Sequence, residues 1–142
     1  MSCWRIRNYA RLINDGAIFA YPTDTIWGFG CHPLNAPAIQ RIQILKNRSR
    51  QKGLILLASS LEQCRPYVDE KQLENHSSRL SQTSTKPLTW IVAANSHCPV
   101  GLTGSRPTIA IRITQHKLIK QLCGELNAPV ISTSANISGR SP

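Results

Sequence analysis

The sequence predicts an α/β fold in which helices pack on a single sheet. Short apolar runs, typical of buried strands, alternate with longer segments whose apolar residues recur every three or four positions, as in amphipathic helices. This alternation is typical of α/β sheets. The 142 residues suffice for one domain with a substantial core, and no linker divides the apolar segments into two sets. We therefore expect a single domain over residues 1–142.

The first predicted elements are a helix and a strand. Residues 4–13 have roughly helical apolar spacing, and Asn14-Asp15-Gly16 ends this helix as a turn. Residues 17–21 are continuously apolar, which indicates a buried strand that Pro22 stops. The polar residues 23–25 then begin a turn.

A second helix is predicted after an irregular stretch. Gly28, Gly30 and Pro33 are expected to keep that stretch irregular. Asn35 is a suitable N-cap, and Pro37 suits the first turn of a helix. The expected inner face of this helix carries Ile39, Ile42 and Leu45.

The most distinctive segment follows this second helix. It holds four cationic side chains at every second position, namely Lys46, Arg48, Arg50 and Lys52. We call residues 46–52 the basic loop. An apolar run over residues 54–58 comes directly after it and predicts a buried strand. A loop mounted on such a strand holds its positive charges in place, which suits a nucleotide triphosphate or a nucleic-acid backbone.

The rest of the chain continues the alternation. Ser59-Ser60 could cap a short helix through Cys64, which Pro66 stops. Residues 71–85 are polar and are either an exposed helix or a mobile segment. The later elements are expected to be a strand (88–94), a Gly/Pro-rich loop (95–107), a strand (109–113), a helix (116–126) and a last strand (129–131).

The composition favours partners that carry phosphate. Seventeen Lys and Arg against seven Asp and Glu give a formal net charge of +10, which attracts polyanions without deciding the fold. The five cysteines lack the spacing of metal ligands or of a disulfide framework, as do the four histidines for a metal site, so we expect reduced, buried thiols and no metal site. The sequence shows neither a signal peptide nor the roughly 20 apolar residues of a membrane span, so we expect a cytoplasmic protein.

Three polar segments adjoin predicted strands: residues 23–25, the basic loop, and residues 132–136. Ligands of open α/β sheets bind where loops leave strand ends, so these segments could converge on one cleft. Taken alone, residues 23–25 are more simply a turn and residues 132–136 more simply a helix cap. Arg112 lies on the opposite face of its strand from Ile111 and Ile113, where it meets either solvent or a carboxylate held by two hydrogen bonds.

Together these segments resemble the YrdC/TsaC family of threonylcarbamoyl-AMP synthases. The matching blocks occur in family order: Tyr21–Gly30, Lys46-Asn47-Arg48 with Lys52-Gly53-Leu54, Ile109–Ile113 and Ser132–Gly139. They span nearly the whole chain, and their order is far more specific than any one motif. The resemblance implies an open, twisted mixed sheet with flanking helices, YrdC/RibB-like, with a basic concave face. Family members continue past Gly139 with a stretch that closes over the nucleotide, so we expect either a fragment or a C-terminally shortened member whose ATP pocket lies open.

The resemblance also implies a reaction and its partners. L-threonine, bicarbonate and ATP would give threonylcarbamoyl-adenylate and pyrophosphate, normally with Mg²⁺. Downstream transfer proteins would then place the threonylcarbamoyl group on adenosine 37 of ANN-decoding tRNAs. Preplaced cations and N–H or O–H donors stabilise the charge that develops during such a transfer, and no covalent enzyme nucleophile is needed.

The resemblance assigns roles residue by residue. The residues that would face the phosphates are Lys46, Arg48 and Lys52, of which Lys46 and Arg48 would be catalytic. Those that would help to hold the nucleotide are Thr108, Ser134 and Asn136. Those that would bind threonine are Thr25, Ser132 and Arg112, with Arg112 on the carboxylate.

Two other functions stay open at this point. The same fold could be a binding module for double-stranded RNA or tRNA that uses phosphate and shape contacts, because aromatic residues for base stacking are sparse. It could also belong to a related branch that shares the fold without an established reaction. The joint presence of Lys46, Arg48, Ser134 and Asn136 favours the synthase over that branch.

Overall fold

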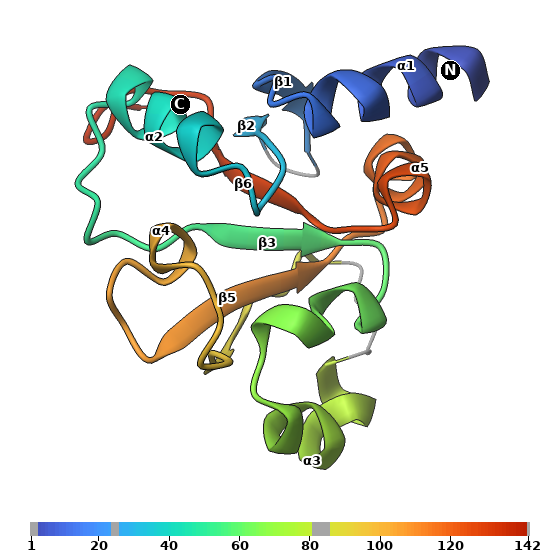
Figure 1. Cartoon of the computed structure of the whole chain (residues 1–142), viewed down its shortest axis with the longest axis vertical. Coiled ribbons are helices and arrows are strands. Elements are labelled where there is room, and N and C mark those ends of the chain that lie inside the picture. Colours follow the sequence, from blue (N-terminus) through green and yellow to red (C-terminus); the bar gives the residue numbers. More distant parts are fainter. Residues whose placement is uncertain (1–2, 24–25, 81–85, 142) are drawn as a thin grey trace.

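The structure, a computed structural model, describes residues 3–23, 26–80 and 86–141, and these contain six strands in one open sheet (Figure 1). The strands are β1 (Phe19–Pro22), β2 (Trp27–Gly30), β3 (Ile55–Ala58), β4 (Trp90–Ala93), β5 (Thr108–Ile113) and β6 (Val130–Ser134). Their order is β1-β2-β6-β3-β5-β4, in which β3 and β5 run parallel and the other neighbours antiparallel. The predicted mixed α/β sheet is confirmed.

Helices flank both faces of this sheet. They are α1 (Cys3–Asn14), α2 (Ala36–Leu45), the 3₁₀ helix η1 (Glu62–Tyr67), α3 (Glu70–Leu80), α4 (Val100–Thr103) and α5 (Lys117–Leu126). Residues of α2, η1, α3 and α4 join the larger core, whereas α5 packs on the other face and α1 packs on α5. No helix in the described ranges has both the length and the apolar character needed to traverse a bilayer.

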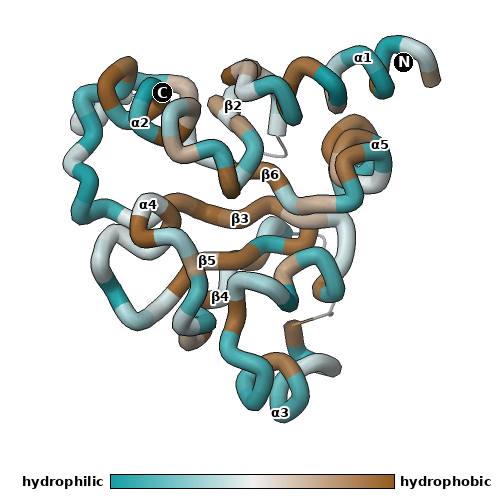
Figure 2. Tube along the Cα trace, in the orientation of Figure 1, coloured by the Kyte–Doolittle hydropathy of each residue, from teal (hydrophilic) through white to brown (hydrophobic). Residues whose placement is uncertain are grey.

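The central strands carry the core. Leu56, Ile111 and Ile131 are fully buried on the face that the larger group of helices covers. On the opposite face, Leu57 and Val130 pack under α5. Figure 2 shows the resulting concentration of hydrophobic residues along β3 and β5.

The predicted second helix forms for the expected reasons. The Asn35 side chain accepts a hydrogen bond from the Ala38 N–H at 2.9 Å, and a proline occupies the first turn. The helix ends where Lys46 caps it, and Asn47 takes a left-handed conformation with φ of 47° that turns the chain into the basic loop. The predicted inner residue Leu45 is instead 57% exposed, and Ala38 and Gln43 are buried.

The irregular stretch predicted around Gly28 and Gly30 is wrong, because these glycines belong to β2. They make room for packing: a Cβ on Gly30 would lie 2.7 Å from the Ile131 carbonyl oxygen and 2.8 Å from ring atoms of Phe19 and Tyr21. The first strand is also less buried than predicted. It lies at the edge of the sheet, where Tyr21 is its buried residue.

Three other predictions differ from the structure. The helix expected after Ser59-Ser60 is η1, and Pro66 lies inside it because a 3₁₀ helix this short tolerates the missing N–H. The loop over residues 95–107 contains α4. The last strand continues to Ser134 rather than ending at Ile131. Of the two alternatives for residues 71–85, the helix holds through Leu80, and residues 81–85 lie outside the described ranges.

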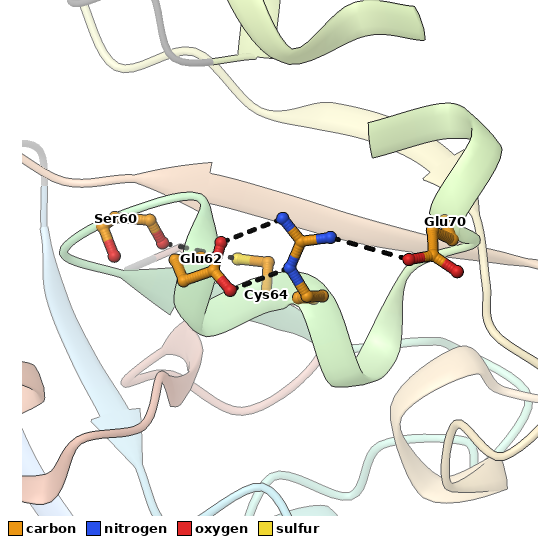
Figure 3. A network of polar contacts seen from close by, with 5 residues as sticks. Ser60, Glu62, Cys64 and Glu70 are labelled. Atoms are coloured by element: carbon orange, nitrogen blue, oxygen red, sulfur yellow. Dashed lines mark hydrogen bonds and ion pairs between the residues drawn. The ribbon is translucent and has the colours of Figure 1, made fainter. Parts of the chain in front are cut away.

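Polar contacts join η1 to α3 (Figure 3). Arg65 donates to both carboxylate oxygens of Glu62, at 2.8 and 3.0 Å, and its Nη1 lies 3.8 Å from Glu70. These ion pairs are exposed to solvent and therefore weak. The buried residues Tyr67 and Leu73 fix the junction instead.

Candidate active site

The register of the sheet leaves part of one face uncovered. Ile55 lies opposite Ser132, and Leu57 lies opposite Arg112, so all four point to the same face. Helix α5 covers this face at Leu57. The part that carries Ile55, Ser132 and Arg112 borders a cavity of about 280 Å³.

Side chains from distant parts of the chain meet at this cavity. Its lining residues are Thr23, Ile26, Trp27, Gly28, Arg48, Ile55, Arg112, Ser132, Thr133 and Ser134. Four predicted site residues are among them: Arg48, Arg112, Ser132 and Ser134. Within the described ranges, the lining includes two guanidinium groups and no carboxylate. A cavity of this kind attracts an anion.

Arg112 reaches the cavity from β5. Its Nε donates to the Thr89 hydroxyl at 2.8 Å, and its terminal nitrogens have no hydrogen-bond partner among the described residues. This contact orients the guanidinium and leaves its two-pronged end available for a carboxylate. Ser132 lies across β3 on the same face. The nearby phenol of Tyr21 donates to the Ile131 carbonyl at 3.3 Å, and burial raises the pKa of that phenol.

Arg48 reaches the cavity from the basic loop. Its Nη2 donates to the Gly53 carbonyl at 2.8 Å, while its buried Nε has no partner among the described residues. Burial lowers the pKa of this guanidinium, and the nearby charge of Arg106 lowers it further. A half-buried cation that lacks a counter-charge favours an anionic ligand, because the ligand would replace the lost hydration.

Lys46 lies behind the cavity wall and is only 1% exposed. Its ammonium donates to the carbonyl oxygens of Ser134 and, at 2.5 Å, of Asn136, and it lies 3.5 Å from the Ser134 hydroxyl. Burial lowers the pKa of this ammonium, with a smaller contribution from the charge of Arg48. The lysine therefore adds positive charge near the cavity without lining it.

The remaining predicted site residues lie around the cavity or outside the described ranges. Lys52 is exposed on the basic loop, and Thr108 lies on the same face of β5 as Arg112 but does not line the cavity. Asn136 follows β6 and donates to the carbonyls of Ile137, at 3.2 Å, and Arg140, while its buried Oδ1 has no partner among the described residues. Thr25 lies outside the described residues.

The sequence predicted that residues 23–25 of the β1–β2 hairpin would adjoin the site, but it did not predict the part of the wall that β2 forms. Trp27 and Gly28 line the cavity, and a Cβ on Gly28 would lie 3.3 Å from the Thr133 carbonyl oxygen. The signal was the alternation Trp27-Gly28-Phe29-Gly30, in which glycines recur every second residue as one face of a strand does. It was overlooked because glycine is rare in strands.

Known proteins are similar to this chain in sequence. A family model described as "Telomere recombination", for Sua5, YciO and YrdC, matches residues 11–142. Threonylcarbamoyl-AMP synthase of Hydrogenovibrio crunogenus is 42% identical over 144 residues, which cover 96% of this chain and 75% of that protein. The protein of the same name from Stutzerimonas stutzeri is 42% identical over 137 residues, covering 96% and 73%.

Solved structures share the fold. A variant of P. abyssi Sua5 superposes with a TM-score of 0.89 at 31% identity, covering 99% of this chain and 43% of that one. P. abyssi Sua5 complexed with L-threonine gives a TM-score of 0.85 at 31% identity, with 99% and 41% covered. This chain thus spans less than half of the Sua5 chain and about three quarters of the two synthases. By its match to the family model and its identity to these relatives, the chain belongs to the Sua5/YciO/YrdC family.

Proposed function

We propose that this protein is a threonylcarbamoyl-AMP synthase, a nucleotidyltransferase that makes threonylcarbamoyl-AMP and pyrophosphate from L-threonine, bicarbonate and ATP. The observation that carries the proposal is the convergence of Arg48, Arg112, Ser132 and Ser134 on one cavity. The names of the relatives and the threonine complex of Sua5 support the same reaction. We further propose that residues 1–142 form a single domain, because all six described strands belong to one sheet.

Arg112 and its neighbours form the threonine end of the site. The guanidinium takes the threonine carboxylate, because Thr89 holds it by Nε and leaves its terminal nitrogens available. Ser132 lies across β3 on the same face and contacts the amino acid beside it. Thr25 completes this end by family resemblance.

Arg48 and its neighbours form the phosphate end. Arg48 contacts the phosphates directly, Lys46 adds its charge from behind Ser134, and Lys52 meets the outer phosphates from the exposed side of the basic loop. Thr108, Ser134 and Asn136 hold the rest of the nucleotide.

The chemistry requires positioning more than proton transfer. The threonine amine and bicarbonate condense to a carbamate and release water. A carbamate oxygen then bonds to the α-phosphorus of ATP, and the bond from that phosphorus to pyrophosphate breaks. Negative charge grows on the α-phosphoryl oxygens and on the leaving group. Arg48 stabilises that charge from a half-buried position that its bond to Gly53 preorganises, where electrostatic interactions are stronger than in water.

Mg²⁺ fits this site as part of the ATP complex rather than as an ion held by the protein. The described lining offers hydroxyl oxygens but no carboxylate, and Mg²⁺ binds such sites largely through substrate phosphates. Bound in that way, the ion would neutralise charge on the triphosphate.

The proposed product implies partners that handle RNA. The adenylate would pass to transfer proteins that modify adenosine 37 of ANN-decoding tRNAs. The net charge of +10 favours an encounter with tRNA or double-stranded RNA.

Turnover tests the proposal directly. The purified protein is incubated with Mg²⁺, ATP and bicarbonate, with and without L-threonine, and pyrophosphate and the adenylate are measured. We expect pyrophosphate release that depends on both threonine and bicarbonate, together with a product of the mass of threonylcarbamoyl-AMP. RNA binding with a steep salt dependence and no such turnover would instead identify an RNA-binding module.

A further inference from the structure

One residue, Lys46, ties the segment that follows β6 to the rest of the protein. We call residues 136–141 the strap; it lies beside the end of α2 in Figure 1. Within the described ranges, every hydrogen bond that joins residues 136–141 to the rest of the chain involves Lys46. The Lys46 ammonium donates to the Asn136 carbonyl, and the Lys46 carbonyl accepts from the Ser138 N–H at 2.8 Å.

The strap's own side chains do little to hold it in place. Asn136 donates only to carbonyls of the strap itself. The Asn136 Oδ1 and the Ser138 Oγ are buried without a hydrogen-bond partner among the described residues. The position of the strap therefore depends on the lysine more than on its own polar groups.

The Lys46 ammonium has no donor left for a phosphate. An ammonium has three N–H groups. Two reach the carbonyls of Ser134 and Asn136, and the third points toward the Ser134 hydroxyl at 3.5 Å. The side chain is 1% exposed, so a ligand in the cavity could meet it only if the strap moved away.

We propose that Lys46 is a positioning residue: it fixes the strap, and with it Asn136, against the end of β6 at Ser134, and it keeps its carbonyl contacts when nucleotide is bound. This inference rests on the proposed function, in which Ser134 and Asn136 hold the nucleotide. It differs from the role that family resemblance assigns to Lys46, which is direct contact with the phosphates. Charge from Lys46 still reaches the cavity through Ser134, but its hydrogen bonds go to the carbonyls of Ser134 and of the strap residue Asn136.

Scalar couplings across hydrogen bonds test the proposal in the unmodified protein. In protein labelled with ¹⁵N and ¹³C, the Lys46 Nζ is expected to couple to the carbonyl carbons of Ser134 and Asn136. These couplings are expected to persist after addition of Mg²⁺ and a non-hydrolysable ATP analogue that saturates the site. Their absence from the free protein, or their loss when the analogue binds, would overturn the proposal.

A pair of variants provides a test that needs no turnover. Lys46→Met removes the donors but keeps the side-chain length, and Lys52→Met is the matched control in the exposed part of the same loop. Without nucleotide, the hydrogen-bonded amides of Ser138 and Arg140 are expected to exchange about tenfold faster in Lys46→Met and at the wild-type rate in Lys52→Met. Unchanged exchange in a folded Lys46→Met would refute the tether; should that variant not fold, the couplings decide.

Kinetics separate this proposal from the proposed function. In an active protein, Lys46→Met is expected to raise the KM for ATP more than the KM for threonine, because the strap lies on the nucleotide side. Equal increases would contradict the positioning role. If wild-type protein makes no adenylate, the proposed function fails, whereas the couplings in the free protein and the exchange rates still decide whether Lys46 tethers the strap.

Discussion

At the scale of single residues, Arg48 differs from the other three cations of the basic loop. Of the described residues that line the cavity, Arg48 alone belongs to the basic loop. Lys46 is turned toward the strap, and Arg50 and Lys52 are exposed. The regular spacing of the four charges in the sequence therefore hides three different environments.

We expect Arg48→Ala to lower kcat/KM for ATP-dependent adenylate formation by about 10²–10³-fold, the usual cost of removing one donor to developing charge. Arg50→Ala, from an exposed position in the same loop, serves as the control and is expected to stay near the wild-type value. Pyrophosphate release measures both variants, and thermal unfolding checks that they fold. Near-normal release by Arg48→Ala would refute its assigned role.

Arg112 is expected to control the use of threonine rather than of ATP. Its terminal nitrogens are free to take a carboxylate while Nε stays on Thr89. We expect Arg112→Ala to raise the KM for threonine at least tenfold more than the KM for ATP. Arg112→Lys keeps the charge but loses the two-pronged contact, so it should recover only part of the loss. Equal increases in both constants would count against this assignment.

Buried thiols are expected to set the alkaline limit of stability. Burial raises the pKa of Cys31, Cys64 and Cys123 to about 12 each, from 9.0. Between these pH values the unfolded chain holds fewer protons than the folded protein, so stability is fully present below about pH 9 and falls as pH rises. Each thiol contributes a slope of about 1.4 kcal/mol per pH unit in that window.

Urea unfolding between about pH 8 and pH 11 measures this effect through the free energy of unfolding. Cys98 adds to the effect, because burial raises its pKa to about 11. The lowered pKa of Lys46 acts in the opposite direction, but one ammonium does not offset four thiols. Cys64→Ala is expected to reduce the alkaline slope by about a quarter. Cys3→Ala, at an exposed position, is the control. A free energy that stays constant to pH 11 would show that these thiols ionise as readily in the folded protein as in the unfolded chain.

At the scale of elements, the mounting of the basic loop depends on close backbone contact with the end of α4. Gly104 ends α4 with a φ of +65°, and a Cβ there would lie 2.4 Å from the Gln51 carbonyl oxygen. A Cβ on Gly53 would lie 3.0 Å from the carbonyls of Leu102 and Thr103. The Leu54 N–H then donates to the Leu102 carbonyl at 2.8 Å, which carries the chain from the loop into β3.

Gly104→Ala is therefore expected to destabilise the protein by about 2 kcal/mol or more and to displace the basic loop, because it adds a clash to a left-handed conformation. Gly124→Ala is the matched control: it lies in α5 with nothing within 4 Å of an added Cβ, so it should stabilise the protein by about 0.5–1 kcal/mol. Denaturant unfolding measures both changes. A Gly104→Ala protein as stable as wild type would show that α4 does not constrain the loop.

The sequence predicted those elements best whose signals are local. Residues 4–13 and 116–126 have helical apolar spacing. The ends of these two segments agree with those of α1 and α5 to within one residue. The apolar run at 109–113 became β5. The sequence did not predict β2, because its glycines are needed for close packing against Tyr21 and Ile131, which lie elsewhere in the chain. The continuation of β6 to Ser134 likewise depends on pairing with β2, which no local pattern encodes.

At the scale of the whole molecule, the candidate site is a product of strand order. Arg112, Ser132 and Ser134 come from β5 and β6, which flank β3, while Arg48 enters from the loop before β3. The sequence predicted that these side chains would meet, because they adjoin strands. It could not predict which part of the sheet face stays open, since that depends on where α5 packs.

A crystal structure of the protein with L-threonine, Mg²⁺ and a non-hydrolysable ATP analogue tests the central claim most directly. We expect both ligands in the cavity of about 280 Å³, with the threonine carboxylate on the Arg112 guanidinium and the phosphates against Arg48. Density for the two ligands in separate places, or a threonine carboxylate that does not touch Arg112, would contradict the account.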